Sequence, residues 1–391
     1  MSKEISFDNT QIAFSGMSNA DLNRAYWLFK VININFLVKI GPPITNAAIK
    51  IGLPIAPLIR ATIFKQFCGG ESISDCANTI RHLHKYKIGT ILDYSVEGES
   101  TEQAFDATCD ETIATIKRAQ NDSAIPFCVF KITGLARFGL LEKLDAQQSL
   151  TEVEVKEFER VKERVRKICQ TAYDLNVRIF IDAEESWIQK TIDQLAMDMM
   201  RLFNRERVMV YNTFQFYRHD SLEIMKNFDA TLKAEGVMMG LKLVRGAYME
   251  KERKRAEELN YPSPIQPDKA SSDKDYDLGL LYCIENINRV AICAGTHNEK
   301  SSKYLVDLMN KYNIVANDER IYFSQLLGMS DNLSYNLADA GYNVAKYVPY
   351  GPVKSVLPYL FRRAQENTAI AGQMGRELSL ILKEKKRRAN A

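Results

Sequence analysis

From residue 88 onward, short apolar runs alternate with longer segments that mix apolar and charged residues. Each run is rich in Val, Ile, Phe, Leu or Tyr, which is typical of strands buried on both faces. There are eight such runs: IGTILDYS, FCVFKIT, VRIFIDAEE, RVMVYNTFQ, GLKLVRGAY, VAICAGTHN, RIYFSQLLG and NVAKYVPYG. The pattern therefore predicts eight parallel strands joined by helical crossovers.

The segments between the runs have the spacing of amphipathic helices. In the segment that follows Thr151, an inward apolar stripe is predicted from Val153, Val155, Phe158, Val161, Val165 and Ile168. Eight strand–helix units in a row favour a (β/α)8 barrel. The rival is a doubly wound open sheet, which normally has a glycine-rich phosphate turn after its first strand. GTILDYSVEG has no GxGxxG motif.

We predict three parts along the chain: an N-terminal helical arm over residues 1–85, a catalytic barrel over 86–380 and a solvated basic tail over 381–391. The arm has no Asp or Glu from Leu22 to Gly70, although several Lys and Arg residues fall there. Basic and apolar residues without acids suit contact with anionic lipid head groups. The alternative is a helical arm that packs on the barrel, and both can hold.

The composition is that of an ordinary globular protein, with 391 residues, 46% hydrophobic and 26% charged. A formal net charge of +3 gives no reason to expect a nucleic-acid partner. The seven cysteines are scattered without a CxxC pair, which indicates reduced, mostly buried thiols. We see no signal peptide and no run long enough to span a membrane, so we expect a cytoplasmic protein able to contact the inner face of a membrane.

Polar residues stand at the carboxyl end of nearly every run. They are Asp93 with Glu97, Lys131, Asp182 with Glu184 and Glu185, Gln215, Lys242 with Arg245, Thr296 with His297 and Asn298, Gln325, and Tyr347. In a barrel these positions converge on one mouth, where barrel enzymes build their sites. Lys131 and Lys242 interrupt apolar strands, so each must pair with an acid such as Asp182 or meet an anionic ligand.

Two further stretches point to a small acid as ligand. In KLVRGAY, Gly246 allows close approach of a ligand, while Arg245 offers a guanidinium fork. In YLFRRAQEN, the adjacent Arg362 and Arg363 suit a carboxylate, and Tyr359 shares their side of the helix. The alternative for the arginine pair is a solvated face. No HExxH or GxSxG motif is present, which disfavours metal chemistry and serine hydrolysis.

Seven stretches in this order resemble the proline dehydrogenase family, flavin enzymes of proline catabolism: DAEESW, YNTFQFY, KLVRGAY, THNEKS, QLLGMSD, KYVPYGPV and YLFRRAQEN. The resemblance spans most of the chain and is nearest to the monofunctional branch. It implies a distorted (β/α)8 barrel with an N-terminal helical extension. It also implies FAD held without a Rossmann fingerprint.

The resemblance assigns expected roles by position. Arg362 and Arg363, assisted by Lys131, would clamp the substrate carboxylate, and Glu97 would pair with Arg362. Leu243, Tyr248, Tyr347 and Tyr359 would enclose the pyrrolidine ring, with Asp182 in support. Contacts to FAD are expected from Gln215, Lys242, Arg245, Gly246, Ala247, Thr296, His297, Asn298, Gln325 and Glu366. Met249 stands where some relatives have a tryptophan against adenine, so no adenine contact is predicted.

The implied reaction is oxidation of L-proline to Δ1-pyrroline-5-carboxylate, with hydride transfer from C5 to N5 of FAD. The electrons would pass to a quinone, and a pyrroline-5-carboxylate dehydrogenase would consume the product. A hydroxyproline dehydrogenase of the same fold is the near alternative. Two alternatives of other classes are a Schiff-base lyase that uses Lys131 or Lys242, and a proline-sensing module without catalysis.

Overall fold

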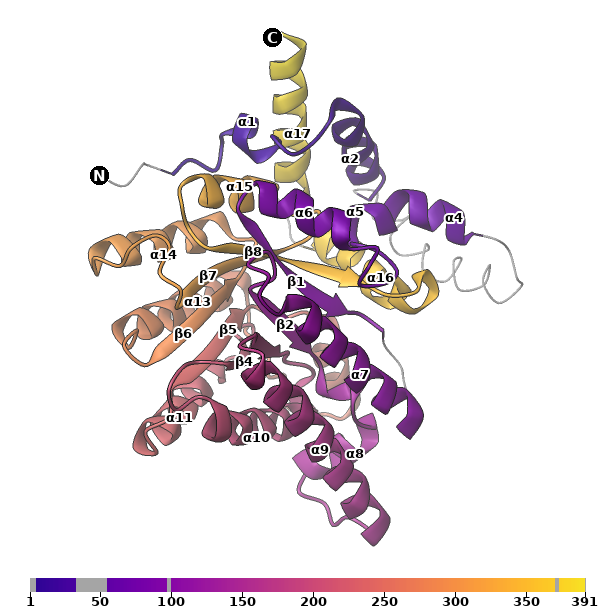
Figure 1. Ribbon diagram of the computed structural model, residues 1–391, viewed down its shortest axis with the longest axis vertical. Helices are drawn as coiled ribbons and strands as arrows, with labels where there is room; N and C mark the ends of the chain where they lie inside the picture. Colours follow the sequence, from indigo (N-terminus) through magenta and orange to yellow (C-terminus); the bar gives the residue numbers. More distant parts are fainter. Residues whose placement is uncertain (1–4, 33–54, 97–99, 370–372, 391) are drawn as a thin grey trace.

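A computed structural model describes residues 5–32, 55–96, 100–369 and 373–390. Its centre is a closed barrel in which each strand pairs in parallel with the next and β8 pairs with β1 (Figure 1). The strands are β1 (Ile88–Tyr94), β2 (Phe127–Phe130), β3 (Arg178–Ile181), β4 (Val210–Gln215), β5 (Met239–Val244), β6 (Val290–Gly295), β7 (Ile321–Leu326) and β8 (Val344–Tyr350). The predicted (β/α)8 barrel is confirmed.

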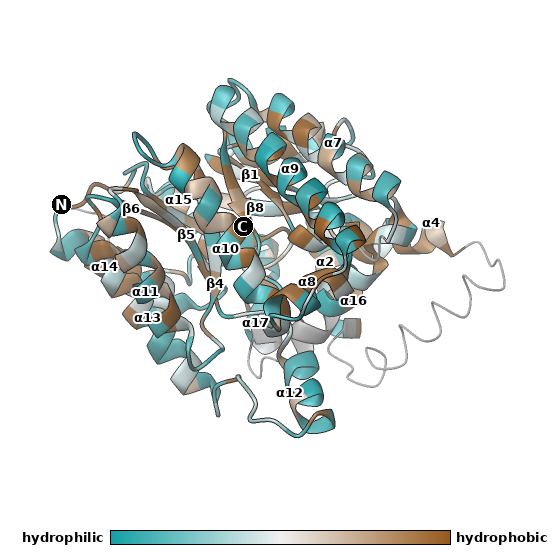
Figure 2. Cartoon of the chain, turned by 90° about the horizontal axis from the view of Figure 1, so that it is seen from below, coloured by the Kyte–Doolittle hydropathy of each residue, from teal (hydrophilic) through white to brown (hydrophobic). Residues whose placement is uncertain are grey.

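Helices surround this barrel, and hydrophilic residues cover outer helices such as α12 (Figure 2). The helices of the barrel are α7 (Glu102–Ala119), η2 (Ile132–Gly134), α8 (Phe138–Asp145), α9 (Glu152–Asp174), α10 (Ser186–Phe203), α11 (Ser221–Ala234), α12 (Met249–Glu258), α13 (Lys269–Glu285), α14 (Glu299–Lys311), α15 (Asp331–Asp339) and α16 (Val353–Ala369). Those of the termini are α1 (Thr10–Ala13), α2 (Asn19–Ile32), α4 (Ala56–Ile59), η1 (Arg60–Phe64), α5 (Lys65–Phe67), α6 (Ala77–Lys85) and α17 (Gln373–Ala389).

Side chains along each strand alternate between two apolar clusters, because successive residues of a strand point to opposite faces. The outer cluster joins the strands to the helices, and it contains Leu241 and Leu243 of β5. The inner cluster fills the barrel and consists of Ile91, Phe127, Val129, Phe180, Tyr211, Ala291, Cys293, Ala345 and Tyr347. A polar residue in step with the inner cluster is therefore directed into the barrel.

Aromatic side chains close the amino-terminal end of the barrel around Arg178. Its guanidinium carbon lies 4.4 Å from the ring centroid of Phe127 and 4.7 Å from that of Tyr322. Arg178 also donates to the carbonyl of Glu319 at 2.9 Å, and the rings of Phe127 and Phe180 stack 4.4 Å apart. Access to the interior is thus left to the carboxyl end, which we call the mouth.

The described part of the N-terminal arm is helical and packs on the barrel. The amide of Gly69 donates to the carbonyl of Pro349 at 2.9 Å, which ties the arm to β8. The side chain of Gln66 donates to the carbonyl of Gly328 at 3.1 Å, just after β7. These contacts place residues 66–70 beside the mouth. Residues 33–54 of the arm lie outside the described residues.

The C-terminal segment 381–391, predicted as a solvated basic tail, falls in and just after helix α17, and most of its described residues are exposed. Helix α17 lies against α1 and α2 (Figure 1), and its residues Leu380 and Ile381 are buried. Arg388 donates to the carbonyl of Phe14 at 2.8 Å, next to the end of α1. The sequence did not predict this packing, because the apolar stripe on α17 is only a few residues long and basic residues surround it.

The predicted stripe of α9 is wrong at its first turn. Val153 is 73% exposed and Val155 is 47% exposed, whereas Val161, Val165 and Ile168 are buried. Glu154 faces inward instead, because it forms a capping box with Thr151 and accepts from Lys143 at 2.6 Å. A helix cap has therefore replaced apolar packing at this end.

All seven cysteines are free and buried, as predicted. In the described ranges of the chain, no helix combines the length and the apolar character that crossing a membrane would require.

The contact between the arm and β7 can be tested with a pair of glycines. Gly328 has φ +75°, and an added Cβ would lie 2.2 Å from the carbonyl oxygen of Gln66. Gly236 has φ +68°, but an added Cβ would meet nothing within 4 Å. We expect Gly236→Ala to cost about 1 kcal/mol of unfolding free energy and Gly328→Ala about 3 kcal/mol. Chemical denaturation measures both, and equal losses would contradict the close contact.

Candidate active site at the barrel mouth

Alternation along five strands directs five polar side chains into the mouth. In each case the polar residue stands two positions after a residue that faces the barrel interior, or between two that face outward. The five are Asp93, Lys131, Asp182, Lys242 and Tyr347, from or just after β1, β2, β3, β5 and β8. The predicted convergence of these residues is confirmed by their contacts.

Asp182 is the centre of this group. Its Oδ1 accepts from the ammonium of Lys242, and Lys242 also donates to the hydroxyl of Tyr347 at 2.5 Å. Tyr347 donates to Asp182 Oδ1 at 3.3 Å. Burial alone would raise the pKa of Asp182, but the charges of Lys242 and Lys131 outweigh it, so this pKa is lowered. Asp182 is therefore a carboxylate at neutral pH.

Lys131 is the more open of the two lysines. Its Nζ lies 3.4 Å from Asp93 and 3.5 Å from Asp182, and its side chain is 23% exposed, against 5% for Lys242. Lys242 is enclosed further, since its ammonium lies 4.4 Å from the ring centroid of Tyr347. Both lysines meet the requirement for an acidic partner, and Lys131 is the one positioned to reach a ligand.

A second group of side chains comes from the neighbouring strands β4, β5 and β6. Arg245 follows β5, and its guanidinium donates to Asp273 at 2.6 Å, to Thr296 at 2.7 Å and to Ser301 at 2.9 Å. The same guanidinium stacks over the ring of Tyr276 at 4.4 Å. Arg245 is therefore fixed in place between β5 and β6.

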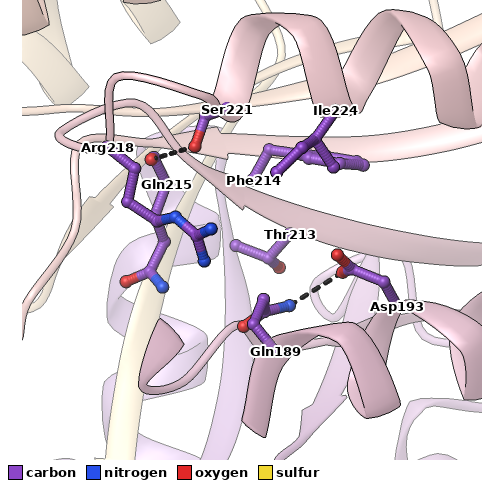
Figure 3. Close-up of a pocket in the computed structure, with 8 residues that line it drawn as sticks. All are labelled: Gln189, Asp193, Thr213, Phe214, Gln215, Arg218, Ser221 and Ile224. Carbon is purple, nitrogen blue, oxygen red and sulfur yellow. Dashed lines mark hydrogen bonds between the residues drawn. The ribbon is translucent and has the colours of Figure 1, made fainter. Parts of the chain in front are cut away.

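Gln215 at the end of β4 is held by hydrogen bonds to two neighbouring residues. Its Nε2 donates to the carbonyl of Glu184 at 2.6 Å, and Ser221 donates to its backbone carbonyl at 2.5 Å. Figure 3 shows these side chains beside a small pocket between β4, α10 and α11, where Gln189 donates to Asp193 at 2.8 Å. Burial raises the pKa of Asp193 to about 6. The end of β4 thus rests on a buried polar network.

His297 follows β6 and is half-buried. Its Nδ1 is 2.9 Å from the hydroxyl of Ser330. Burial, followed by the positive charges of Lys346, Arg363 and Arg245, lowers the pKa of His297 to about 3. The imidazole is therefore neutral at physiological pH and presents one donor and one acceptor nitrogen.

Helix α16 brings Tyr359 and the two arginines to the same region. Arg363 is 7% exposed, and its guanidinium carbon lies 5.1 Å from the ring centroid of Tyr359, itself buried. Arg362 is half-buried. The alternative of a solvated face is thus wrong for Arg363. Tyr359 belongs to the same apolar cluster as Met329, and Leu326 packs against that cluster, so this part of α16 lies beside the end of β7.

In the turn after β5, the structure shows a packing reason for Gly246 in addition to the predicted approach of a ligand. Gly246 has φ +132°, and an added Cβ would lie 2.5 Å from ring carbons of Tyr217. A glycine is therefore required at this position because the ring of Tyr217 leaves no room for a side chain, whether or not a ligand lies close by. Ala247 is exposed, and Tyr248 is half-buried at the start of α12.

Three expected site residues make contacts with neighbouring elements of the protein. Leu243 belongs to the outer cluster and packs toward α13, where a Cβ added to Gly279 would lie 3.0 Å from its Cδ2. Gln325 accepts from Ser334 at 2.8 Å and donates to the carbonyl of Thr296 at 3.2 Å, so it supports the β6 turn. Asn298 caps α14 by accepting from two of its backbone amides.

Two further predictions fall where the structure gives no description. Glu97 lies in the segment 97–99, and the side chain of Glu366 lies in the undescribed part of α16. Their assigned roles stay predictions.

Two residues near the mouth were missed by sequence reasoning. Leu326 packs against the inner cluster with Tyr347 and against the cluster that contains Tyr359, so it is the leucine that joins the barrel interior to α16. Lys346 is 1% exposed and pairs with Asp331 at 2.7 Å. Lys346 interrupts an apolar strand just as Lys131 and Lys242 do, and that signal could have identified it.

Comparison with known proteins gives a consistent result. A family model described as proline dehydrogenase matches residues 76–376. Proline dehydrogenase 1, mitochondrial, of Dictyostelium discoideum is 32% identical over 426 residues, covering 97% of this chain and 74% of that protein. The human protein of that name is 38% identical over 256 residues, covering 65% of this chain and 42% of that protein. The carbapenem antibiotics biosynthesis protein CarD of Pectobacterium carotovorum is 32% identical over 322 residues, with 82% and 83% covered.

Among solved structures, proline utilization A of Bdellovibrio bacteriovorus has a TM-score of 0.73 at 20% identity. The match covers 96% of this chain and 41% of that chain, so this chain spans less than half of that longer protein. At this identity the likeness concerns the fold. Together with the family model and the sequence relatives, it leads to one conclusion: the chain belongs to the proline dehydrogenase family.

Proposed function

We propose that this chain oxidises L-proline to Δ1-pyrroline-5-carboxylate, with FAD as hydride acceptor and a quinone as the final electron acceptor. Membership of the proline dehydrogenase family makes it an oxidoreductase that acts on proline. The observation that carries the residue-level proposal is the position of Arg363, buried beside Tyr359 on the helix that follows β8.

The substrate side of the mouth is formed by α16 and by strands β8 and β1–β3. Arg363 and Arg362 bind the carboxylate of proline, and Lys131 approaches it from the barrel. Tyr359, Tyr347 and Tyr248 enclose the ring. Bidentate, charge-assisted bonds from guanidinium to carboxylate fix orientation as well as affinity. This arrangement leaves C4 and C5, the two ring carbons not bonded to the carbon that carries the carboxylate, away from the clamp.

The residues on the other side fit a flavin. Gln215, Arg245 and His297 carry N–H groups at the ends of three neighbouring strands, and Thr296 adds a hydroxyl. A flavin dinucleotide presents ring carbonyls, ring nitrogens and a pyrophosphate, which such donors recognise. Gly246, Ala247 and Asn298 form the rim of this side. Bound flavin would supply the acceptor for the hydride that leaves C5 of proline.

The protein contributes orientation and charge. The clamp would position proline with its amine neutral, so that the nitrogen lone pair forms the C=N bond as hydride leaves C5 and the N–H proton passes to solvent. Lys242, kept in place by Asp182 and Tyr347, provides a positive charge close to the reacting centre. A fixed charge in a water-poor site stabilises negative charge that develops during the reaction.

The alternatives make different demands on the same residues. A Schiff-base lyase needs a neutral lysine amine, whereas Lys242 donates to the ionised Asp182 and to Tyr347. A hydroxyproline dehydrogenase needs space for an extra hydroxyl, and the family resemblance implies a smaller residue at the position of Tyr347 in relatives that prefer hydroxyproline. We therefore place proline ahead of hydroxyproline, and kcat/KM for the two substrates compares them.

We also propose that the arm contacts the membrane that holds the quinone, on its inner, cytoplasmic face. Trp27 is 59% exposed on α2 and Leu58 is 67% exposed on α4. The ammonium of Lys30 lies 4.9 Å from the ring centroid of Trp27. An exposed aromatic ring beside a cation suits the head-group region of an anionic bilayer. A pyrroline-5-carboxylate dehydrogenase is the proposed consumer of the product.

A spectrum tests the proposed chemistry directly. The purified protein should be yellow, and anaerobic addition of L-proline should bleach the visible flavin band. A lyase would be colourless and trapped covalently by borohydride in the presence of substrate. A binding module would leave the flavin band, if any, unchanged by proline.

The clamp is tested by Arg363→Met. Loss of charge-assisted bonds to the carboxylate should lower kcat/KM for proline by about 10–150-fold, which corresponds to about 1.5–3 kcal/mol. Arg205→Met, at an exposed position before β4, is the control and should leave kcat/KM unchanged. A loss below about threefold in Arg363→Met would remove Arg363 from the clamp, since one charged bond is worth more than this.

Membrane contact is tested by sedimentation with vesicles that contain anionic phospholipid. The protein should sediment at low salt and be released at high salt, because exposed charges are screened. Trp27→Ala should weaken this binding. Leu202→Ala, which removes another exposed apolar side chain (53% exposed, on α10), should not. Absence of sedimentation with any vesicle would refute the contact.

A further inference from the structure

Ser330 has an unusual backbone conformation for its place in the fold. It has φ +50° and ψ +45° directly before α15 and is 1% exposed. The other described non-glycine residues with positive φ follow the ends of helices and are exposed: Lys87, Asn121, Gln147, Asn176, Asn260 and Asn313. A left-handed serine costs free energy and persists only when its surroundings hold it. The positive φ of Ser330 is therefore not explained by the end of a helix.

Two elements hold this loop from opposite sides. The amide of Ser330 donates to Oε1 of Glu377 in α17 at 2.5 Å, and Glu377 is 5% exposed. From β8, the ammonium of Lys346 donates to the carbonyl of Met329 at 2.7 Å and pairs with Asp331 at 2.7 Å. The conformation of Ser330 is thus set between the C-terminal helix and the barrel.

Ser330 also contacts His297. The hydroxyl of Ser330 is 2.9 Å from its Nδ1, and the ring is neutral. In a neutral imidazole, the bond made at one nitrogen decides whether the other is a donor or an acceptor. The same bond also fixes the orientation of the ring. Ser330 therefore controls what His297 can offer to a bound group.

We propose that Glu377 is a positioning residue for the flavin side of the mouth, acting through Ser330 on His297. The proposal rests on the proposed function, in which His297 contacts FAD. Glu377 lies one residue beyond the region that the family model matches, 76–376, so the contact comes from a segment outside that region. It gives α17 a role at the mouth besides its packing on α1 and α2.

The electrostatic surroundings of Glu377 are consistent with an acceptor role. Burial and the charge of Asp331 raise its pKa to about 7, while the bonds from Ser330 and the charge of Lys346 oppose the rise. An oxygen that accepts from the Ser330 amide is present whether or not the carboxyl is protonated. A glutamine, which keeps this oxygen, should therefore replace Glu377 with little loss.

The test is binding of FAD to deflavinated protein, followed by quenching of flavin fluorescence. Glu377→Ala should weaken the Kd for FAD about tenfold, because a buried amide loses its acceptor and the loop relaxes. Glu377→Gln should stay within about threefold of wild type, since it retains an acceptor. Lys383→Gln is the control: it removes only a bond from α17 to the carbonyl of Asp8 and should bind FAD like wild type.

A double-mutant cycle separates positioning from general loosening of the helix. Ser330→Ala alone should also weaken FAD binding about tenfold, and combining it with Glu377→Ala should add little, because both act through His297. Additive effects, or equal losses in Glu377→Ala and Glu377→Gln, would overturn the proposal. Should Glu377→Ala fail to fold, Ser330→Ala and Glu377→Gln still decide it.

The two proposals fail in different ways. Wild-type protein that does not bind FAD would refute the proposed function. Wild-type protein that binds FAD, with Ser330→Ala and Glu377→Ala binding equally well, would refute the positioning role alone.

Discussion

The mouth of this barrel depends on one carboxylate, Asp182, held between two ammonium groups. A carboxylate in the interior is costly unless it is paired, and removal of one partner from a buried pair typically costs about 3–5 kcal/mol. Here Lys242 and Lys131 keep Asp182 ionised, and Tyr347 is bonded to both Asp182 and Lys242. The group forms because each member follows an apolar residue of its own strand at the spacing that turns it inward. Aromatic packing around Arg178 closes the opposite end, so the polar group has one direction in which to meet a ligand.

Elements outside the eight repeated units contact the loops at the mouth. The arm lies against the ends of β7 and β8 through Gln66 and Gly69, and α17 reaches the loop before α15 through Glu377. Both contacts use backbone groups as partners, so they depend on the path of the chain more than on a particular side-chain pair. The barrel carries the polar residues of the mouth, and segments near the two termini contact the loops that follow its strands.

Strand periodicity was enough to predict the barrel and the inward residues, because buried parallel strands leave a strong signal and period two fixes their direction. It gave no information on a residue that only the family resemblance assigned to the site and that faces the helices, or on the use of a residue as a helix cap. Leu243 faces the helices because it is adjacent to the inward Lys242, and Asn298 is used by the first turn of α14. Glu377 could not have been predicted, since nothing local marks which distant amide a helical carboxyl will accept. The same limit applies to Ser330, whose left-handed backbone has no sequence signature such as glycine.

In the proposed function, charge balance favours a carboxylate clamp that comes from α16. Within the barrel, Lys131 and Lys242 face Asp93 and Asp182, so the two cations are already matched by two acids. Proline with a neutral amine brings one more negative charge, and Lys131, which is already shared between Asp93 and Asp182, cannot balance that charge alone. Arg363, buried beside Tyr359 and close enough to influence His297, is an additional cation on the same side. In the proposed function, binding of the anionic substrate therefore depends on the position of α16, and the contacts of α17, which follows this helix, become part of substrate recognition.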